Sequence, residues 1–260
     1  MEKYGVENIL NTTGNTILIT GGNSGIGRGL AEAFHKLGNQ VIIAGRRKQT
    51  LDETTAASPG MQSIVLDVED ADAIRTFATE VVAQYPALNV LINNAGIMRA
   101  ESLLAESDTL ADMEATITTN LLGPIRLTTA LLPHLQKQSQ AVIMNVSSGL
   151  AFVPLVMTPT YSATKAALHS YTEALRVQLK QTAIRVIELI PPAVATELMP
   201  GGSSNPRAMP LDAYIAESIQ LLTDQPSATE IAVESVKFLR FAAQGGQYET
   251  VFNMLNATPR

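Results

Sequence analysis

The stretch TGGNSGIG, Thr20 to Gly27, joins a short apolar run to an amphipathic segment and decides the fold. The run TILIT (16–20) precedes it, and apolar residues recur after it at helical spacing, at Ile26, Leu30, Phe34 and Leu37. Gly21, Gly25 and Gly27 permit a tight turn and a close approach of the backbone to a bound group. Because a helix N-terminus offers free N–H groups and partial positive charge, the stretch predicts a pyrophosphate site.

The glycine spacing is Gly-x-x-x-Gly-x-Gly, which differs from the commoner G-x-G-x-x-G fingerprint. Taken alone, it leaves open a chance glycine-rich turn. A phosphate loop of the G-x-x-x-x-G-K-[ST] type does not occur in the chain. The position of the turn, directly after the first apolar run, favours the dinucleotide interpretation.

Further apolar runs alternate with helical patterns along the chain. The expected strands are 16–20, 40–44, 63–66, 89–92, 141–146, 184–190 and 248–254. They lack strict polar alternation, which indicates burial on both faces. The alternation of strands and helices predicts one α/β domain over residues 1–260, with a parallel sheet covered by helices on both sides. The segment 199–215, rich in Gly, Ser and Pro at its start, is either a substrate lid or a plain surface loop.

Composition narrows the class of protein. The chain has 260 residues, a net charge of −6 and no basic block, which argues against nucleic-acid binding. There is no cysteine, so disulfides and thiolate ligands are excluded. We expect no membrane span, no secretory signal and a cytoplasmic location. We also expect no metal site, and we interpret His35, His134 and His169 as solvated or packed side chains.

Charged residues after the second and third expected strands bear on the choice of cofactor. Arg46 and Arg47 stand where many dinucleotide sites carry a carboxylate for the ribose 2′-hydroxyl. A guanidinium suits a 2′-phosphate, which favours NADP, with Arg46 as first choice; a solvated cation pair is the alternative. Asp67 either accepts from the adenine amino group or caps a helix. The segment NNAG (93–96) either lines a flat cofactor or forms a turn.

A tyrosine and a lysine four residues apart form the candidate acid–base pair. Tyr161 and Lys165 share one face of an expected helix, and an adjacent ammonium lowers the pKa of a phenol. Such a phenol serves as general acid toward a carbonyl oxygen; the alternative is an ordinary exposed helix face. Ser148, at the end of an expected strand, is favoured over Ser147 to bind the same substrate oxygen. Asn120 either holds a relay water beside Lys165 or only bends its helix.

The motifs TGGNSGIG, NNAG, Asn120, Ser148, YSATK and PPAVAT, in this order, resemble those of the short-chain dehydrogenase/reductase family from about residue 15 to 254. The resemblance implies a single Rossmann-type domain with a seven-stranded parallel sheet, and hydride transfer between a nicotinamide and a carbonyl carbon. The catalytic residues it implies are Asn120, Ser148, Tyr161 and Lys165. The cofactor-binding residues that we expect are Gly21, Asn23, Ser24, Gly25, Ile26, Gly27, Arg46, Arg47, Asp67, Val68, Asn94, Ala95, Gly96, Tyr161, Lys165, Pro191, Val194 and Thr196.

Two departures and one subgroup refine this resemblance. Pro192 stands where the family usually has glycine, and Ser24 stands where some NADP-binding members have a basic residue. The segments SSGLAFVPL, YSATKAALHSYTEALR and VIELIPPAV resemble DltE-type short-chain oxidoreductases.

We therefore expect an NADP(H)-dependent oxidoreductase, with NAD(H) as a possible second cofactor, acting on a small-molecule carbonyl or secondary alcohol. The resemblance also implies a homodimer or homotetramer, and the small residues Ala163, Ala166 and Ala167 suit either subunit packing or internal packing. The alternatives are a dinucleotide-sensing regulatory protein without turnover, and an epimerase or dehydratase on the same fold.

Overall fold

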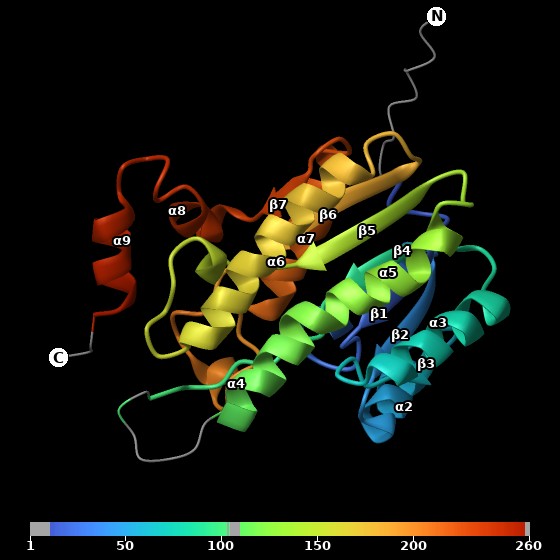
Figure 1. The fold of residues 1–260 in the computed structure, drawn as a ribbon, viewed down its shortest axis with the longest axis horizontal. Coiled ribbons are helices and arrows are strands. Elements are labelled where there is room, and N and C mark those ends of the chain that lie inside the picture. Colours follow the sequence, from blue (N-terminus) through green and yellow to red (C-terminus); the bar gives the residue numbers. More distant parts are fainter. Residues whose placement is uncertain (1–10, 103, 105–109, 258–260) are drawn as a thin grey trace, which may run out of the picture.

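One seven-stranded parallel sheet organises the protein, whose computed structural model describes residues 11–102, 104 and 110–257 (Figure 1). Its strand order is β3-β2-β1-β4-β5-β6-β7. The strands are β1 (Thr16–Thr20), β2 (Gln40–Gly45), β3 (Gln62–Val65), β4 (Leu88–Asn93), β5 (Ala141–Val146), β6 (Ile184–Ile190) and β7 (Glu230–Ala232). The order reverses between β1 and β4, which is where such sheets bind ligands at their carboxyl edge.

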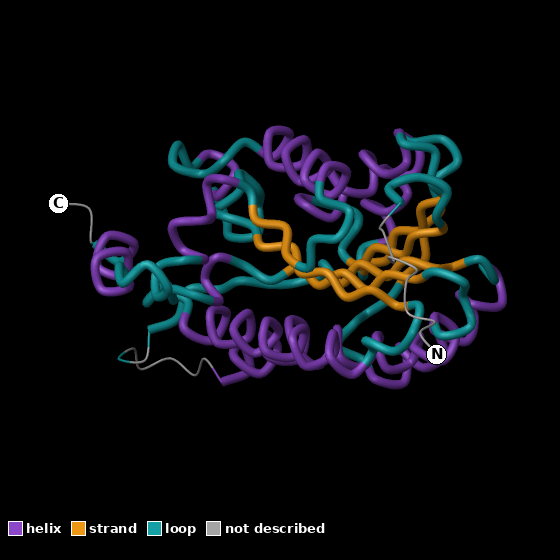
Figure 2. The backbone as a smooth tube through the Cα atoms, turned by 90° about the horizontal axis from the view of Figure 1, so that it is seen from above, coloured by secondary structure: helices purple, strands orange, loops and turns teal. Residues whose placement is uncertain are grey.

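Helices cover both faces of the sheet (Figure 2). They are α1 (Gly25–Lys36), α2 (Lys48–Ala57), α3 (Ala71–Gln84), α4 (Leu110–Ile117), α5 (Gly123–Leu135), α6 (Pro159–Gln178), α7 (Leu211–Asp224), α8 (Lys237–Arg240) and α9 (Tyr248–Leu255). A π-helical turn, η1 (Thr118–Leu122), joins α4 to α5, and short 3₁₀ turns lie at η2 (Gly149–Ala151), η3 (Gly202–Ser204) and η4 (Glu234–Val236). Within the described residues, no helix combines the length and apolar character that a bilayer crossing requires.

The sheet separates two hydrophobic cores, because successive residues of a strand point to opposite faces. In β1, Ile17 and Ile19 enter the core shared with α1 and α7, whereas Leu18 enters the core shared with α3 and α5. All three are at most 1% exposed. The predicted doubly wound fold and burial of both sheet faces are therefore confirmed, except at the outer strand β3, where Val65 is 53% exposed.

The prediction of a strand over 248–254 is wrong, because those residues form helix α9. This helix lies beyond α8 and away from the sheet in Figure 1. Val251 is buried, and Tyr248, Phe252 and Leu255 are partly buried around it, a helical repeat that β-forming residue types had obscured. The seventh strand is instead β7, which has only three residues and a single buried apolar side chain, Ile231. Because β7 is so short, the pattern of apolar residues in the sequence did not indicate it.

The segment 199–215 is a loop only in its first part. Helix α7 begins at Leu211, and Tyr214 and Ile215 are buried in the core. The segment predicted as a lid therefore extends too far, because its last residues belong to helix α7. Met209 exchanges backbone hydrogen bonds with Ala193 (2.8 Å) and Ala195 (2.9 Å), so the end of the loop is tied to the segment that follows β6.

Candidate active site

The glycine turn between β1 and α1 is as tight as the sequence predicts. Gly21 and Gly25 have positive φ angles of 66° and 51°, which side chains disfavour. A Cβ atom at Gly27 would lie 2.3 Å from both the Gly21 carbonyl oxygen and Asn94 Nδ2. No side chain fits there without moving the turn, so glycine at this position lets the start of α1 pack closely against the end of β1.

Asn94 braces this turn from the end of β4. Its Nδ2 donates to the carbonyl oxygens of Thr20 (2.9 Å) and Gly21 (3.3 Å), and its backbone N–H donates to Thr20 Oγ1 (3.0 Å). The N–H of Ala95 donates to the same hydroxyl at 3.1 Å. Asn94, one of the expected cofactor-binding residues, therefore already holds two strand ends together.

The segment after β6 faces the glycine turn. A Cβ atom at Gly25 would lie 3.4 Å from Thr196 Cγ2, so the two loops lie close together. Pro191 accepts a hydrogen bond from the N–H of Gly149 at 2.9 Å, which joins this segment to the turn that follows Ser148. Val194 lies opposite Met209 in a single β-bridge. Gly25, Val194 and Thr196 thus belong to one region of the surface.

Arg46 directly follows β2, and its side chain is paired with a carboxylate. Its Nη1 lies 3.1 Å from Glu69 Oε1, and this carboxylate also accepts from Thr119 Oγ1 at 2.6 Å. The Arg46 side chain remains half-exposed. Arg47 stands at the N-cap of α2 and makes no side-chain capping bond. Glu69 is the partner that fixes Arg46 at this edge.

Asp67 does not cap a helix, so that alternative is wrong. Helix α3 begins four residues later, and Asp70 is its N-cap, accepting from the N–H groups of Asp72 and Ala73. Asp67 Oδ1 instead accepts from the N–H of Glu69 at 3.0 Å and holds the turn after β3. Val68, in the same turn, is buried.

Three of the expected catalytic side chains lie together in a buried group at the carboxyl end of β5. Tyr161, Ser148 and Lys165 are 5%, 7% and 4% exposed. Lys165 Nζ donates to the carbonyl oxygen of Val146 at 2.8 Å and lies 5.6 Å from the centre of the Tyr161 ring. Ser147 is turned the other way, with its Oγ 3.4 Å from the carbonyl oxygen of Leu189.

The electrostatics of this group differ from the sequence-based expectation. Burial raises the pKa of Tyr161 to about 12, and its interaction with the Ser148 hydroxyl only partly opposes this. Burial also lowers the pKa of Lys165 to about 8. The negative charge of Glu188 raises this pKa and so opposes part of the effect of burial. Desolvation is therefore the largest influence on the pKa of both groups, and Lys165 is not among the groups that lower the pKa of the phenol.

Asn120 lies in the π-helical turn η1 and is fully buried. Its Oδ1 accepts from the N–H of Ile97 and its Nδ2 donates to the carbonyl oxygen of the same residue, both at 2.8 Å. The expectation of local helix irregularity is confirmed. A Cβ atom at Gly96 would lie 3.3 Å from Asn120 Oδ1 and 3.8 Å from Lys165 Nζ, which places all three residues in one neighbourhood.

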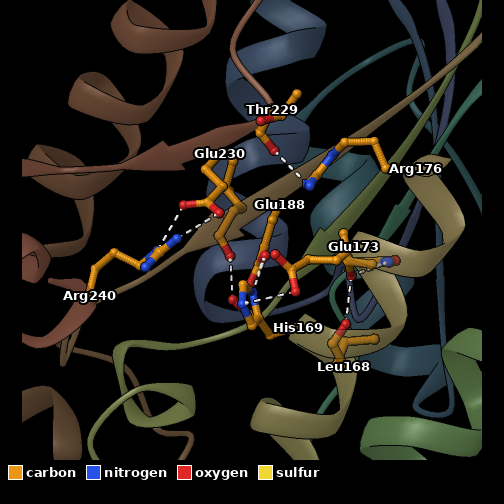
Figure 3. A network of polar contacts seen from close by, with 12 residues as sticks. Leu168, His169, Glu173, Arg176, Glu188, Thr229, Glu230 and Arg240 are labelled. Carbon is orange, nitrogen blue, oxygen red and sulfur yellow. Dashed lines mark hydrogen bonds and ion pairs between the residues drawn. The ribbon is translucent and has the colours of Figure 1, made fainter. Parts of the chain in front are cut away.

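A charged cluster behind this group was missed by sequence analysis (Figure 3). His169 Nδ1 lies 2.7 Å from Glu188 Oε2, and Glu188 is fully buried in β6. Glu188 and Glu230 are register partners on adjacent strands, and Arg240 binds both oxygens of Glu230, at 2.8 and 2.9 Å. His169 was interpreted as merely solvated or packed. Its hydrogen-bond partner Glu188 comes from strand β6, so no local spacing could indicate this contact.

Donor atoms of His169, Glu188 and Glu230 lie within 4.8 Å of one another, a spacing compatible with a metal ion. Two observations explain the cluster without a metal. Arg240 already neutralises Glu230 through two hydrogen bonds, and the His169 ring already binds Glu188. A further cation would have to displace both contacts.

The open, doubly wound parallel sheet, with a glycine turn at its switch point, defines a Rossmann-type α/β protein. Residues 15–206 match the model of the short chain dehydrogenase family. The chain belongs to this family of NAD(P)-dependent oxidoreductases.

A curated relative supports this assignment, and solved structures share the fold. The chain is 38% identical over 246 residues, 94% of its length and 97% of the relative's, to the "Uncharacterized oxidoreductase DltE" of Bacillus subtilis (strain 168). It resembles a short chain dehydrogenase of Burkholderia cenocepacia J2315 in complex with NADP, with a TM-score of 0.79, 24% identity, and 96% and 100% of the two chains covered. It also resembles 3-ketoacyl-(acyl-carrier-protein) reductase of Brucella melitensis complexed with NADH, with a TM-score of 0.74, 27% identity, and 84% and 94% covered.

Proposed function

We propose that this protein is an NADP(H)-dependent oxidoreductase that interconverts a carbonyl group and a secondary alcohol, with Tyr161 as general acid and base. One observation carries the proposal: Tyr161, Ser148 and Lys165 form one buried group at the same sheet edge as the glycine turn. Parallel strands bring their carboxyl ends to one edge, so a dinucleotide on the turn and a substrate beside Tyr161 would meet there.

The residues present fit a dinucleotide. Gly21 and Gly25 have positive φ angles that side chains disfavour, a Cβ atom at Gly27 would collide with the Gly21 carbonyl oxygen, and Gly25 lies next to Thr196. The start of α1 would hold the diphosphate through its N–H groups. The glycine turn and the segments that follow β3, β4 and β6 would hold the rest, through Asn23, Ser24, Ile26, Asp67, Val68, Ala95, Gly96, Pro191, Val194 and Thr196. When bound, the dinucleotide supplies the hydride.

Tyr161 holds the proton that a carbonyl oxygen must receive. Because its pKa is raised to about 12, the phenol is protonated throughout the physiological range. A protonated, buried hydroxyl is the form required of a general acid in carbonyl reduction. In the reverse direction, the phenol must first lose its proton, which the ammonium of Lys165 would favour if it moved closer to the phenol oxygen.

Ser148 and Lys165 position the reacting atoms. The Ser148 Oγ accepts from the N–H of Leu150 at 3.1 Å and its hydroxyl is hydrogen-bonded to Tyr161, so both hydroxyls lie where they could donate to one substrate oxygen. Lys165 is anchored on Val146 through one of its three N–H groups, and the other two remain to bind a ribose hydroxyl. Asn120, clamped on Ile97, fixes the backbone beside Gly96.

The NADP preference rests on Arg46. Its guanidinium is half-exposed at the end of β2, and a forked donor suits a 2′-phosphate. At Gly45, a Cβ atom would lie 2.7 Å from Asn23 Oδ1, so a ribose-binding carboxylate could not be housed there without displacing Asn23. Solved relatives have been crystallised with either NADP or NADH, and the arginine is the feature of this chain that favours the former.

The homo-oligomer remains a proposal as well. Ala163 and Ala166 are exposed on the outer face of α6, where small side chains would let a second copy approach closely.

The test is a binding titration followed by a turnover screen. The fluorescence of NADPH and of NADH is titrated with the protein, and a panel of small ketones and aldehydes is then screened with the tighter cofactor by absorbance at 340 nm. We expect tighter binding of NADPH and consumption of it with at least one carbonyl. Binding without any turnover across the panel would favour a dinucleotide sensor, and no binding of either cofactor would overturn the proposal.

A further inference from the structure

Helix α6 places two titratable side chains on one face. Lys165 and His169 are four residues apart, so they are neighbours one turn apart. Strand β6 lies against this helix and presents Glu188 to it. Ile184 and Val186, which alternate with it along the strand, pack in the core that contains Leu175 of α6. The carboxylate therefore lies under the same face that carries the proposed catalytic lysine.

Glu188 is a fully buried carboxylate with only half of its hydrogen-bonding capacity used. Its Oε2 binds His169 at 2.7 Å, whereas its Oε1 has no hydrogen-bond partner within the described residues. An ionised carboxylate so buried needs nearby positive charge. Arg240 is committed to Glu230, and Arg176 donates to the carbonyl oxygens of Val186 and Thr229.

The charged groups around His169 come from every element packed on it. Glu173 Oε2, on its own helix, lies 3.8 Å from Nε2 and is exposed, and Glu230 and Arg240 face it from β7 and α8. Phe152, just after the Ser148 turn, contacts the His169 ring edge-on at 4.7 Å and lies 4.4 Å from the Arg240 guanidinium. The cluster thus borders both the Lys165 turn of α6 and the turn that carries Ser148.

We propose that Glu188 is a positioning residue for the proposed reaction: held in place by His169, this buried carboxylate keeps the Lys165 ammonium charged. The inference rests on the proposed function only for the role of Lys165. Its physical basis is that a lysine 4% exposed loses its proton readily, and a nearby negative charge opposes that loss. Exposed Glu173 lacks this influence, because water and salt screen it.

The experiment reads the charge of Lys165 directly and needs neither substrate nor cofactor. The full chain is prepared with ¹³C at lysine Cε and histidine Cε1, and both resonance sets are followed by NMR from pH 5 to 11. The sequence has seven lysines and three histidines, so Lys165→Met and His169→Gln suffice to assign the two signals of interest. The isosteric variant is Glu188→Gln, and Glu173→Gln is the matched control.

In Glu188→Gln we expect the midpoint of the Lys165 titration to fall by about one pH unit or more, and that of His169 to fall with it. In Glu173→Gln the Lys165 midpoint should stay within about 0.3 of the wild-type value, as is usual for screened surface charges. Equal Lys165 midpoints in wild type and Glu188→Gln, or an equal fall in both variants, would overturn the proposal.

If Glu188→Gln does not fold, the titration of the wild type alone tests the proposal. Because Glu188 would couple the two groups, the Lys165 signal should show a second inflection at the pH where His169 titrates. A Lys165 curve without that inflection contradicts the proposal. Since no dinucleotide is present, this result is independent of whether the chain binds NADPH, and the failure of either proposal can be recognised separately.

Discussion

Lys165 Nζ donates a hydrogen bond to the carbonyl oxygen of Val146 at 2.8 Å. The bond ties helix α6 to the carboxyl end of β5, two residues before Ser148. It also satisfies an amine that is otherwise desolvated, since Lys165 is 4% exposed. The position of the proposed catalytic lysine is thus fixed by the sheet itself, and its burial has a consequence for stability.

Replacement of Lys165 by Met should remove a rise in stability at alkaline pH. Burial lowers the pKa of Lys165 from 10.5 to about 8, so between these values the unfolded chain binds more protons than the folded chain. The free energy of unfolding therefore increases with pH through this window, by roughly 3 kcal/mol from this group. Urea denaturation at pH 7.5, 9 and 10 should show the rise in wild type and in a surface control, Lys137→Met. A rise of equal size in Lys165→Met would contradict the burial argument.

The opposite sign is expected for His169. Its hydrogen bond to Glu188 is the main cause that raises its pKa above 6.5, while partial burial opposes the shift. The stabilisation is therefore complete below about pH 6.5 and is lost as the pH rises through the folded-state value. The difference in Tm between wild type and His169→Gln should be largest near pH 6 and shrink toward pH 9. Ser170→Ala, an exposed neighbour on α6, should show no such trend; a constant difference for His169→Gln would refute the ion pair.

Arg46→Gln should weaken the binding of NADPH by about tenfold while leaving that of NADH nearly unchanged, because only the former carries a 2′-phosphate for the guanidinium to bind. Fluorescence titrations of both cofactors measure the two dissociation constants. Arg75→Gln, which removes an exposed arginine paired with Asp72 on α3, is the control for net charge. If both cofactors weaken equally, Arg46 does not select between them.

Gly27→Ala should raise the dissociation constant for NADPH by about tenfold or more. The added methyl group would lie 2.3 Å from the Gly21 carbonyl oxygen, so the turn must shift. Gly245→Ala, far from the turn and with a nearest contact of 3.3 Å, should bind normally. Circular dichroism checks that both variants are folded. Undiminished binding by a folded Gly27→Ala protein would place the dinucleotide elsewhere.

Much of the fold could be predicted because local patterns carry it. The apolar runs at 16–20 and 141–146 are buried strands with the predicted bounds. The glycine turn between β1 and α1 also lies at the predicted residues. The seventh strand was misplaced because β7 has one buried apolar residue, whereas α9 is rich in strand-forming residue types. An apolar pattern is clear only where many side chains are buried, and a three-residue strand at the edge of the sheet buries few of them.

The site was predictable by residue type but not by electrostatics. Tyr161, Lys165 and Ser148 could be placed together because strand ends and one helix face fix their positions. Whether their charges are solvated depends on the whole surrounding core, which no short motif contains. The ion pairs Arg46–Glu69 and His169–Glu188 likewise join residues 23 and 19 positions apart, through register and helix placement that the sequence does not display.

The role of Tyr161 is tested most directly by removing one oxygen atom. Tyr161→Phe and the control Tyr171→Phe, an equivalent change on the same helix, are compared with wild type for NADPH binding and for reduction of a carbonyl found in the screen. Loss of a general acid typically costs about 10² to 10⁴ in rate. We predict a loss of that size in Tyr161→Phe with NADPH binding retained, and near wild-type turnover in Tyr171→Phe. Turnover by Tyr161→Phe within about twofold of wild type would contradict the assignment of Tyr161 as the proton donor.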